Sequence, residues 1–205
     1  MSDPGIDGRR LRSDRSRAAV VDALLTLYEE GNAQPGAAEI ARRAGVSERS
    51  VFRHFEDLDS LAVATIEIEL QRIGDLFTLP DGDTLDARVR ALVDQRVALY
   101  SATGAVARAA LLLVPRSGVV ANAVRYRRDV LWRQVGALFA AELEPLPKRD
   151  REEIVDAIDV LCSIEGIELL AATDRHTPAR TRRMLIRAVT AVLDTRDTGD
   201  PGANA

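Results

Sequence analysis

The sequence is poor in cysteine, aromatic residues and long apolar runs. One cysteine, Cys162, in 205 residues excludes an intrachain disulfide framework and a zinc site built from cysteines. Aromatic residues make up only 4% of the chain, which argues against a sugar-binding cleft or a base-stacking platform. The longest apolar stretches, such as 109–114, are too short to span a bilayer, and residues 1–17 are too polar for a secretory signal. We therefore expect a cytoplasmic protein without metal, cofactor or membrane contact.

The chain is otherwise that of an ordinary globular protein, with 46% hydrophobic and 29% charged residues. Its net charge of −4 first argues against a nucleic-acid partner. The charge is unevenly distributed, however, because residues 8–55 hold nine arginines and six acids while the remainder is acidic. An acidic total therefore does not exclude DNA binding by the N-terminal part. Lys148 is the only lysine, which is consistent with the compositional bias of a GC-rich genome.

Apolar residues recur at helical spacing along the whole chain, and convincing strand alternation is absent. This pattern predicts an all-α protein of about nine helices, with three short helices in a compact head and the others in a larger C-terminal bundle. We expect a disordered Arg-rich arm at 1–14, a head at 15–56, a bundle at 57–195 and a disordered tail at 196–205. The expected helices span 17–30, 37–44, 48–55, 57–77, 85–102, 105–114, 119–143, 149–172 and 178–194.

Residues 36–55 have the pattern of two short helices that cross around a tight turn. Ala41 is small where the second helix passes closely, and Gly45 stands where the turn needs a positive backbone dihedral. Val46 fills the gap between the helices, and Val51 faces inward from the second one. This spacing predicts a helix-turn-helix motif, whose second helix reads the major groove of DNA.

The motif and its flanking helices resemble the TetR family of bacterial one-component regulators. The resemblance covers residues 15–61 and includes the Ala-Gly-Val-Ser turn, an aromatic at Phe52, and the His54-Phe55 pair. It implies an all-helical homodimer whose heads bind double-stranded palindromic operator DNA. It also implies that the C-terminal bundle holds the dimer together and binds a small-molecule effector. The bundle itself carries no recognisable motif.

The residues expected to contact DNA lie on the two helices of the motif. Arginine can read guanine bidentately and glutamate can accept a hydrogen bond from cytosine, although the same charges also suit a solvated face. Backbone N–H groups at the start of the first helix can bind a phosphate. The resemblance places the histidine near phosphate, and a packed structural histidine is the alternative. The expected DNA-binding residues are Gly36, Ala37, Ala38, Ser47, Glu48, Arg49, Ser50, Phe52, Arg53 and His54.

Two positions depart from the family pattern. Phe52 replaces the usual tyrosine, and Leu58 stands where a phosphate-binding lysine is frequent. Both changes should lower the number of neutralised phosphates and the salt dependence of binding. The N-terminal arginines could compensate at the minor groove or at neighbouring phosphates, or could belong to a solubilising tail. These arginines are Arg9, Arg10, Arg12, Arg15 and Arg17.

The bundle offers an effector pocket and a dimer interface. Polar and aromatic residues within apolar helices mark a pocket for a hydrophobic or amphipathic effector, although each residue alone also suits a core or a surface. The expected pocket residues are Phe77, Gln95, Tyr100, Tyr126, Trp132, Phe139 and Cys162. The resemblance implies a dimer interface on the last two helices, with ion pairs within them as the alternative. The expected interface residues are Ile158, Glu165, Glu168, Arg183 and Arg187.

These patterns favour a sequence-specific transcriptional regulator, a repressor released from its operator by its effector, and not an enzyme. No nucleophile motif, Gly-rich phosphate loop or metal-protease motif occurs in the sequence. The alternatives are a helical small-molecule-binding protein or enzyme with an incidental helix-turn-helix-like head, and a protein-interaction module. An enzyme predicts a buried catalytic pair and no DNA affinity, whereas an interaction module predicts a protein partner on residues 48–53.

Overall fold

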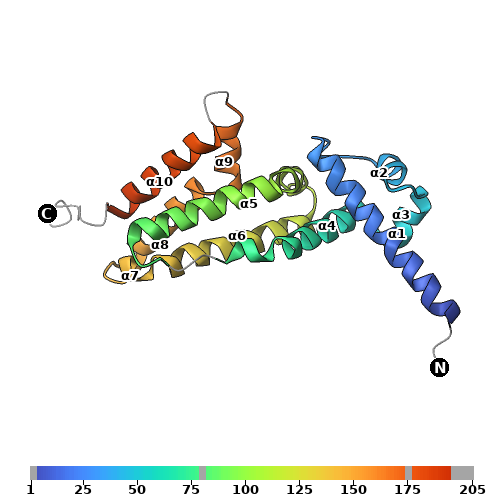
Figure 1. Ribbon diagram of the computed structural model, residues 1–205, viewed down its shortest axis with the longest axis horizontal. Helices are drawn as coiled ribbons and strands as arrows, with labels where there is room; N and C mark the ends of the chain where they lie inside the picture. Colours follow the sequence, from blue (N-terminus) through green and yellow to red (C-terminus); the bar gives the residue numbers. More distant parts are fainter. Residues whose placement is uncertain (1–3, 79–81, 174–176, 195–205) are drawn as a thin grey trace. The chain divides into compact units, whose positions relative to one another are not determined.

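The computed structural model describes residues 4–78, 82–173 and 177–194, which form ten α-helices, one 3₁₀ helix and no strand (Figure 1). This confirms the predicted all-α class. The helices are α1 (Pro4–Glu29), α2 (Ala37–Ala44), α3 (Glu48–His54), α4 (Leu58–Arg72), the 3₁₀ helix (Gly74–Phe77), α5 (Leu85–Leu113), α6 (Gly118–Leu138), α7 (Ala140–Leu143), α8 (Lys148–Leu161), α9 (Ile164–Ala171) and α10 (Pro178–Asp194).

The chain divides into two compact units that do not follow the predicted boundary at residue 56. Unit 1 contains residues 1–72 and 105–126, and unit 2 contains residues 73–104 and 127–205. Helix α4 joins unit 1 because its buried residues, Leu61 and Ala64, belong to the same apolar cluster as α1 to α3. The long helices α5 and α6 each contribute one part to either unit.

Helix α1 begins at Pro4, so the expected disorder over residues 1–14 is wrong for residues 4–14. Proline suits the first helical turn, where its missing N–H group is not needed. The arginines that follow are good helix formers. The side chains of Arg9 and Arg10 and the expected tail at 196–205 lie outside the described part of the chain.

Four other helix boundaries differ from the prediction. The expected helix 57–77 is α4 followed by the 3₁₀ helix, and the expected helix 119–143 is divided into α6 and α7. Helix α5 continues through Gly104, where a break was expected, because the buried residues Val106 and Ala109 offset the modest cost of a glycine in a helix. The expected helix 149–172 is instead two helices, α8 and α9. The break follows Cys162, where Ser163 Oγ accepts a hydrogen bond from the Gly166 backbone N–H at 2.9 Å and so starts a new helix.

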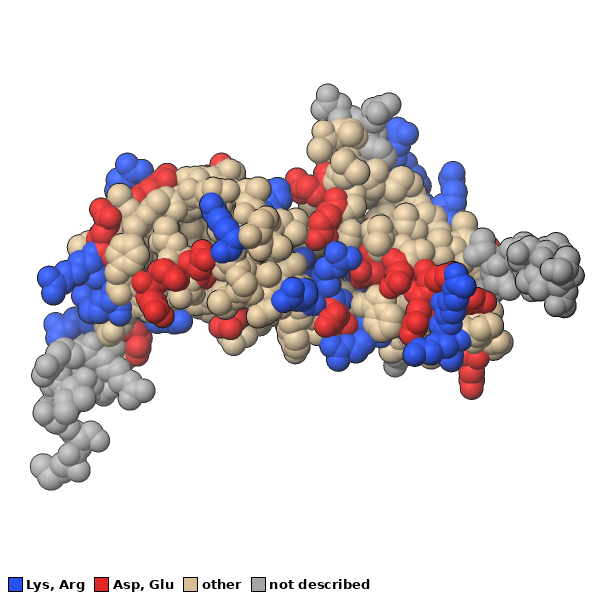
Figure 2. Space-filling view, turned by 180° about the vertical axis from the view of Figure 1, so that it is seen from behind, with Lys and Arg blue, Asp and Glu red and all other residues tan. Residues whose placement is uncertain are grey.

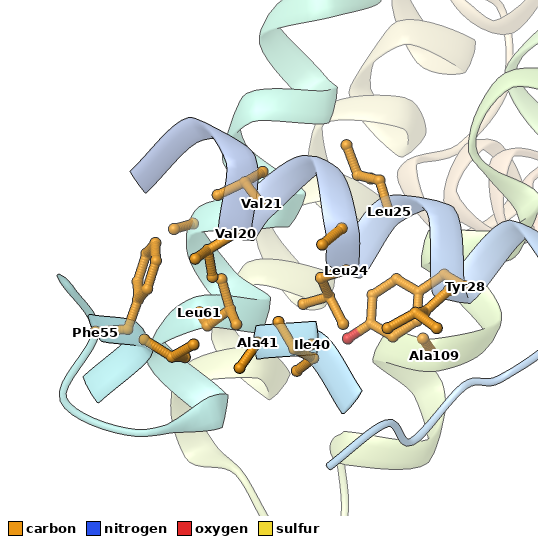
Figure 3. Packing of buried hydrophobic residues seen from close by; sticks show 14 of the residues in the cluster. Val20, Val21, Leu24, Leu25, Tyr28, Ile40, Ala41, Phe55, Leu61 and Ala109 are labelled. Atoms are coloured by element: carbon orange, nitrogen blue, oxygen red, sulfur yellow. The ribbon is translucent and has the colours of Figure 1, made fainter. Parts of the chain in front are cut away.

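The core of unit 1 holds the short helices α2 and α3 against α1. Figure 3 shows apolar side chains from α1, α2, α4 and α5 filling the space between these helices. Val20 and Val51 are fully buried, and Tyr28 is 5% exposed. Burial and the neighbouring charge of Asp59 raise the pKa of Tyr28 to about 12. A smaller cluster of Ala62, Ala110, Leu113 and Val120 joins α4 to the adjoining parts of α5 and α6.

The core of unit 2 is formed by α8, α9 and α10 with the first part of α5 and the last part of α6. The apolar stripe of α10 is regular, since Leu185, Val189 and Leu193 are all fully buried. By length and composition, α5 is the one helix in the described residues that could cross a membrane. Buried core helices pass the same test, and α5 contributes residues to the cores of both units.

Candidate nucleic-acid interface

The turn between α2 and α3 depends on a left-handed glycine. Gly45 has φ 68° and ψ 30°, and it ends α2. The Val46 N–H group donates to the Ala41 carbonyl oxygen at 3.0 Å, and the Gly45 N–H group donates to that of Arg42 at 3.3 Å. These two bonds satisfy carbonyl groups that the helix end leaves free. The backbone therefore reverses sharply enough to set α3 across α2.

We expect Gly45→Ala to destabilise the protein by about 1–2 kcal/mol, because an alanine in the left-handed region brings its Cβ too close to the following carbonyl oxygen. No other atom lies within 4 Å of the added Cβ, so the loss measures backbone strain alone. Gly36→Ala is the matched control, since Gly36 also has open space around it but an extended backbone with φ −81°. Urea denaturation of both variants checks this prediction, and equal stabilities would contradict it.

Helix α3 begins at a side-chain cap. Ser47 Oγ accepts a hydrogen bond from the Ser50 backbone N–H group at 3.2 Å, and the two hydroxyl oxygens are 3.0 Å apart. Glu48 lies in the first turn, where its negative charge interacts favourably with the positive end of the helix dipole. The seven-residue helix therefore starts at a defined residue, which fixes the direction of the side chains that follow.

One face of α3 is buried and the other is exposed. Val51 is fully buried in the core of unit 1. Glu48, Arg49 and Arg53 are exposed, and Phe52 is 48% exposed, which is high for a large apolar side chain. The structure thus brings the predicted base-contacting residues together on one outward surface.

Helix α2 is fixed to the end of α1 by polar side chains. Both terminal nitrogens of Arg43 donate to the Glu30 carboxylate, at 2.7 and 2.6 Å. The Asn32 side-chain amide donates to Glu39 Oε2 at 2.8 Å. Exposed ion pairs contribute little stability individually, but a bidentate arginine pair is well oriented. These bonds orient α2 relative to the end of α1, and apolar contacts hold it there.

His54 is tied to α1. Its Nε2 lies 3.2 Å from Ser16 Oγ and 3.3 Å from an Arg53 terminal nitrogen. Because a guanidinium can only donate, Nε2 accepts that bond and the ring is neutral. Desolvation and the charges of Arg53 and Arg17 lower the pKa of His54, in agreement with a neutral ring. The geometry supports a structural contact as well as the expected place near phosphate.

Phe55 ends α3 in the core, and Arg17 lies above its ring with the guanidinium carbon 5.0 Å from the ring centroid. This cation–π contact also brings a positive charge to the side of α1 that adjoins α3. Arg12 and Arg15, earlier on α1, are exposed. The remaining predicted residues lie at the start of α2, where Gly36 precedes Ala37 and Ala38 and no side chain caps the helix.

The charges of the molecule are intermixed. Figure 2 shows acidic and basic side chains interspersed over one face, so no broad field of one sign covers it. This distribution agrees with the small positive excess of residues 8–55. Non-specific attraction to DNA should therefore be modest, and any specificity must depend on a few arginine contacts.

Comparison with known proteins identifies the N-terminal segment. Residues 21–65 match the family model described as bacterial regulatory proteins, tetR family. This segment of the chain is therefore similar to the TetR family. The matched residues extend from α1 to α4 and contain the whole helix-turn-helix. The resemblance to the TetR family that the sequence predicts is accordingly confirmed for these residues.

Solved structures show that the fold continues beyond the matched segment. A transcriptional regulator from Rhodococcus sp. Rha1 has a TM-score of 0.69 at 18% identity, over 89% of this chain and 96% of that chain. A tetR-family transcriptional regulator from Streptomyces coelicolor has a TM-score of 0.69 at 19% identity, over 90% and 82%. A search of curated proteins gave no match. At these identities the structures support the TetR-family fold of the bundle and not its ligand.

The predicted effector residues have diverse environments. Tyr126 is 66% exposed and belongs to unit 1, whereas the other six belong to unit 2. Phe139 and Cys162 are buried in the core, where burial raises the pKa of the Cys162 thiol to about 12. Trp132 donates to Asp156 Oδ1 at 2.7 Å and lines an open hollow of about 660 Å³.

The other three predicted pocket residues make polar contacts inside unit 2. The Tyr100 hydroxyl donates to Glu168 Oε2 at 2.7 Å, and the Phe77 carbonyl oxygen accepts from Gln134 at 2.5 Å. Gln95 is 7% exposed and lies next to the buried Arg96. The structure therefore places Gln95, Phe139 and Cys162 in the interior of unit 2, and it places Tyr126 apart from them at the surface of unit 1.

The residues predicted for the dimer interface also differ in their exposure to solvent. Ile158 is fully buried within the core of unit 2, so it cannot be presented to a second subunit; helix α8 turns its apolar side toward α10. Arg183 and Arg187 are exposed and line a shallow hollow of about 420 Å³ with Arg180 and Met184. Glu165 and Glu168 are half-buried.

Two functional candidates, Arg96 and Arg127, are absent from the predicted pocket residues; of these, Arg127 stands among arginines near Trp132 that could pair with a ligand carboxylate, whereas sequence reasoning missed Arg96. Both are largely buried in unit 2, and burial lowers the pKa of each. A signal existed for Arg96, because it occupies a position on the apolar stripe of α5 that Val89, Leu92 and Val93 define. Within the described residues, no group of three or more His, Cys, Asp or Glu side chains could hold a metal ion.

Proposed function

We propose that this TetR-family regulator is a homodimeric repressor that binds a palindromic operator in the cytoplasm and is released by a small hydrophobic or amphipathic effector. The observation that carries the proposal is the outward face of α3. Arg49 and Arg53 are exposed on this face, while Val51 is buried in the core of unit 1 and holds the helix in place. A short, capped helix with one buried and one polar face suits the major groove.

Direct reading of the bases falls to the exposed side chains of α3. Arg49 and Arg53 are suited to the O6 and N7 acceptors of guanine, and Glu48 can accept a hydrogen bond from the amino group of cytosine. Phe52 has no hydroxyl group for a phosphate, but its exposed ring can contact a thymine methyl group. These roles would make affinity depend on base identity more than on charge.

Contacts with the DNA backbone would fix the register of α3. The N–H groups of Ala37 and Ala38, after Gly36, lie at the positive end of α2 and can bind a phosphate. Ser47 and Ser50 can donate their hydroxyl hydrogens to a phosphate at the start of α3. His54 would support this arrangement through its contact with Ser16 on α1.

Regulation requires two heads and two states. Heads about 34–36 Å apart would reach successive major grooves on one side of a palindrome. We place the dimer interface on α9 and α10, with Glu165, Glu168, Arg183 and Arg187 as its polar residues. An effector in unit 2 would favour a head spacing that does not fit the operator, provided that it binds the two states unequally.

Selection of binding sites from a random duplex library tests the proposal. We expect a palindrome with half-sites one helical turn apart, bound as two protomers per duplex with a Kd that rises steeply with salt. The regulator's own upstream DNA should contain such a site. Recovery of no enriched sequence, or only salt-insensitive binding, would contradict the proposal.

The helical start of α1 predicts a specific effect on salt dependence. As a helix it is about 10–12 Å wide with its side chains and cannot enter a minor groove of about 6 Å, so Arg12 and Arg15 would contact phosphates. The variant with both arginines replaced by alanine should bind all sequences more weakly and reduce the slope of log K against log salt by about 2.

Fluorescence anisotropy over a range of salt concentrations measures this slope. Arg149→Ala is the control, because Arg149 is exposed in unit 2 and forms an ion pair with Glu153 on its own helix. An unchanged slope in the double variant, with both arginines removed, would show that the start of α1 lies away from the DNA.

A further inference from the structure

Arg96 is a buried cation whose hydrogen-bond partners are all neutral. Its side chain is on α5, and the residue is 3% exposed. The guanidinium donates to Gln95 Oε1 at 2.5 Å, to Gln134 Oε1 at 2.8 Å and to the Leu131 carbonyl oxygen at 3.0 Å. None of these acceptors carries a negative charge, so the charge of Arg96 is solvated by dipoles alone.

A second largely buried cation, Arg127, lies on α6. The charge of Asp159 acts on both Arg96 and Arg127, which places the two guanidinium groups around one carboxylate. The Arg127 Nε is buried and has no hydrogen-bond partner in the described residues. Gln95 Nε2 is also buried without a partner. Two donors near Arg96 and Arg127 therefore lack the acceptors that buried polar groups normally have.

The neighbouring charges leave an excess of positive charge. Arg96, Arg127 and Arg128 interact with one another or with Asp159, and the negative groups around them are Asp159 and Glu165. Asp159 is already 3.3 Å from a terminal nitrogen of Arg128. Cys162 is a neutral thiol because burial raises its pKa to about 12. Three cations thus adjoin two carboxylates, and the two that are largely buried are Arg96 and Arg127, since the Arg128 side chain is 47% exposed.

Such an arrangement is unfavourable in the protein alone and favourable with an anion. Burying a charged group without a counter-ion has a large desolvation penalty, and a free donor in the interior adds to it. A bound oxyanion would supply both the missing charge and the missing acceptors, through charge-assisted hydrogen bonds with the arginines. Natural proteins keep unfavourable groups of this kind mainly at functional sites.

We propose that Arg96, Arg127 and Gln95 form the headgroup site for the effector, and that the effector is an amphipathic oxyanion, a carboxylate or a phosphate with an apolar body. This rests on the proposed function, which requires an effector in the bundle, and it names the chemical class. The surrounding residues Leu92, Val93 and Val135 are fully buried and apolar, which suits an aliphatic chain and not a polar one.

Calorimetric titration with three probes of equal chain length tests the charge requirement. Octanoate, octyl phosphate and octanamide share an eight-carbon body, and the amide lacks the negative charge. We expect saturable binding of at least one anion, at one site per chain, with an affinity at least tenfold above that of the amide. The anion that binds more tightly distinguishes a carboxylate from a phosphate headgroup. Equal binding of all three, or binding of none, overturns the proposal.

Arg127→Met tests the residue assignment, with Arg133→Met as the matched control. Arg133 is on the same helix but exposed, and it bonds only to a carbonyl group one turn away. We expect Arg127→Met to weaken binding of the anion by at least tenfold and Arg133→Met to leave it unchanged. The thermal midpoint of Arg127→Met without ligand should be unchanged or higher, because a buried unpaired charge is removed.

A purely structural role for Arg127 predicts the opposite pair of results, a lower midpoint and unchanged anion binding, and would overturn the assignment. Arg96→Lys gives a second measurement, since it keeps the charge but loses the planar fork and should weaken binding less than Arg127→Met. Because these titrations contain no DNA, failure to bind an operator would contradict the proposed function without affecting them.

Discussion

Replacement of both Arg49 and Arg53 by alanine is expected to abolish specific operator binding. Each bidentate contact between an arginine and guanine contributes about 1–3 kcal/mol of discrimination, so the double variant should lose about thirtyfold to ten-thousandfold in affinity for the selected site. Both side chains are exposed on α3, so their removal should leave the core around Val51 intact. Binding to unrelated duplexes should fall much less.

The measurement is titration of the selected operator and of a scrambled duplex at one fixed salt concentration. Circular dichroism and sedimentation verify that the fold and the oligomeric state are retained. Arg149→Ala removes an exposed arginine from unit 2 and should bind like the wild type. Specific binding by the double variant at wild-type affinity would show that another surface reads the DNA.

The helix-turn-helix could be predicted from the sequence because local requirements determine it. The turn needs a residue with a left-handed backbone, which is Gly45. The close crossing of the two helices needs a small residue, which is Ala41, and the second helix needs a buried apolar residue at a fixed spacing from the turn, which is Val51. Each requirement restricts residue type at one position, so their combination is readable without tertiary information. The structure has all three residues in the predicted roles.

The bundle could be predicted less well because its helix boundaries depend on tertiary burial. Gly104 is a typical break by local propensity, yet α5 passes through it since burial on both sides favours a continuous helix. Conversely, the stretch from Arg149 looks continuous by periodicity, and one serine cap at Ser163 divides it. Propensity alone could not decide either case.

The interior polar residues were the hardest part of the candidate site to predict. Composition suggested aromatic and polar pocket residues, and these lie in different places: Phe139 is fully buried in unit 2, whereas Tyr126 is 66% exposed in unit 1. Arg96 was the more informative residue, because a cation on an apolar stripe must find partners inside the protein. Which partners it finds depends on the neighbouring helix α6, and that packing cannot be read from the spacing within α5.

The second large expected effect is a loss of stability when a residue is truncated in the core of unit 1, which positions α3. Leu61, on α4, is fully buried in the cluster that also contains Val20, Val51 and Phe55 (Figure 3). We expect Leu61→Ala to destabilise unit 1 by about 2–5 kcal/mol, because it loses buried apolar surface and leaves a cavity that rigid neighbours cannot fill. That loss is a large fraction of the stability of a typical domain.

Urea denaturation and amide hydrogen exchange measure this effect, with Leu112→Ala as the matched control. Leu112, on α5, is 51% exposed and lies outside the proposed dimer interface, so the same substitution there should change stability by less than about 0.5 kcal/mol. Exchange protection should fall in α1 to α4 and remain in α8 and α10, whose core in unit 2 is separate from the cluster around Leu61. Equal loss of protection in both units would mean that they unfold as one. In that case Leu61→Ala would weaken operator and effector binding together, whereas independent unfolding would confine its effect to the operator.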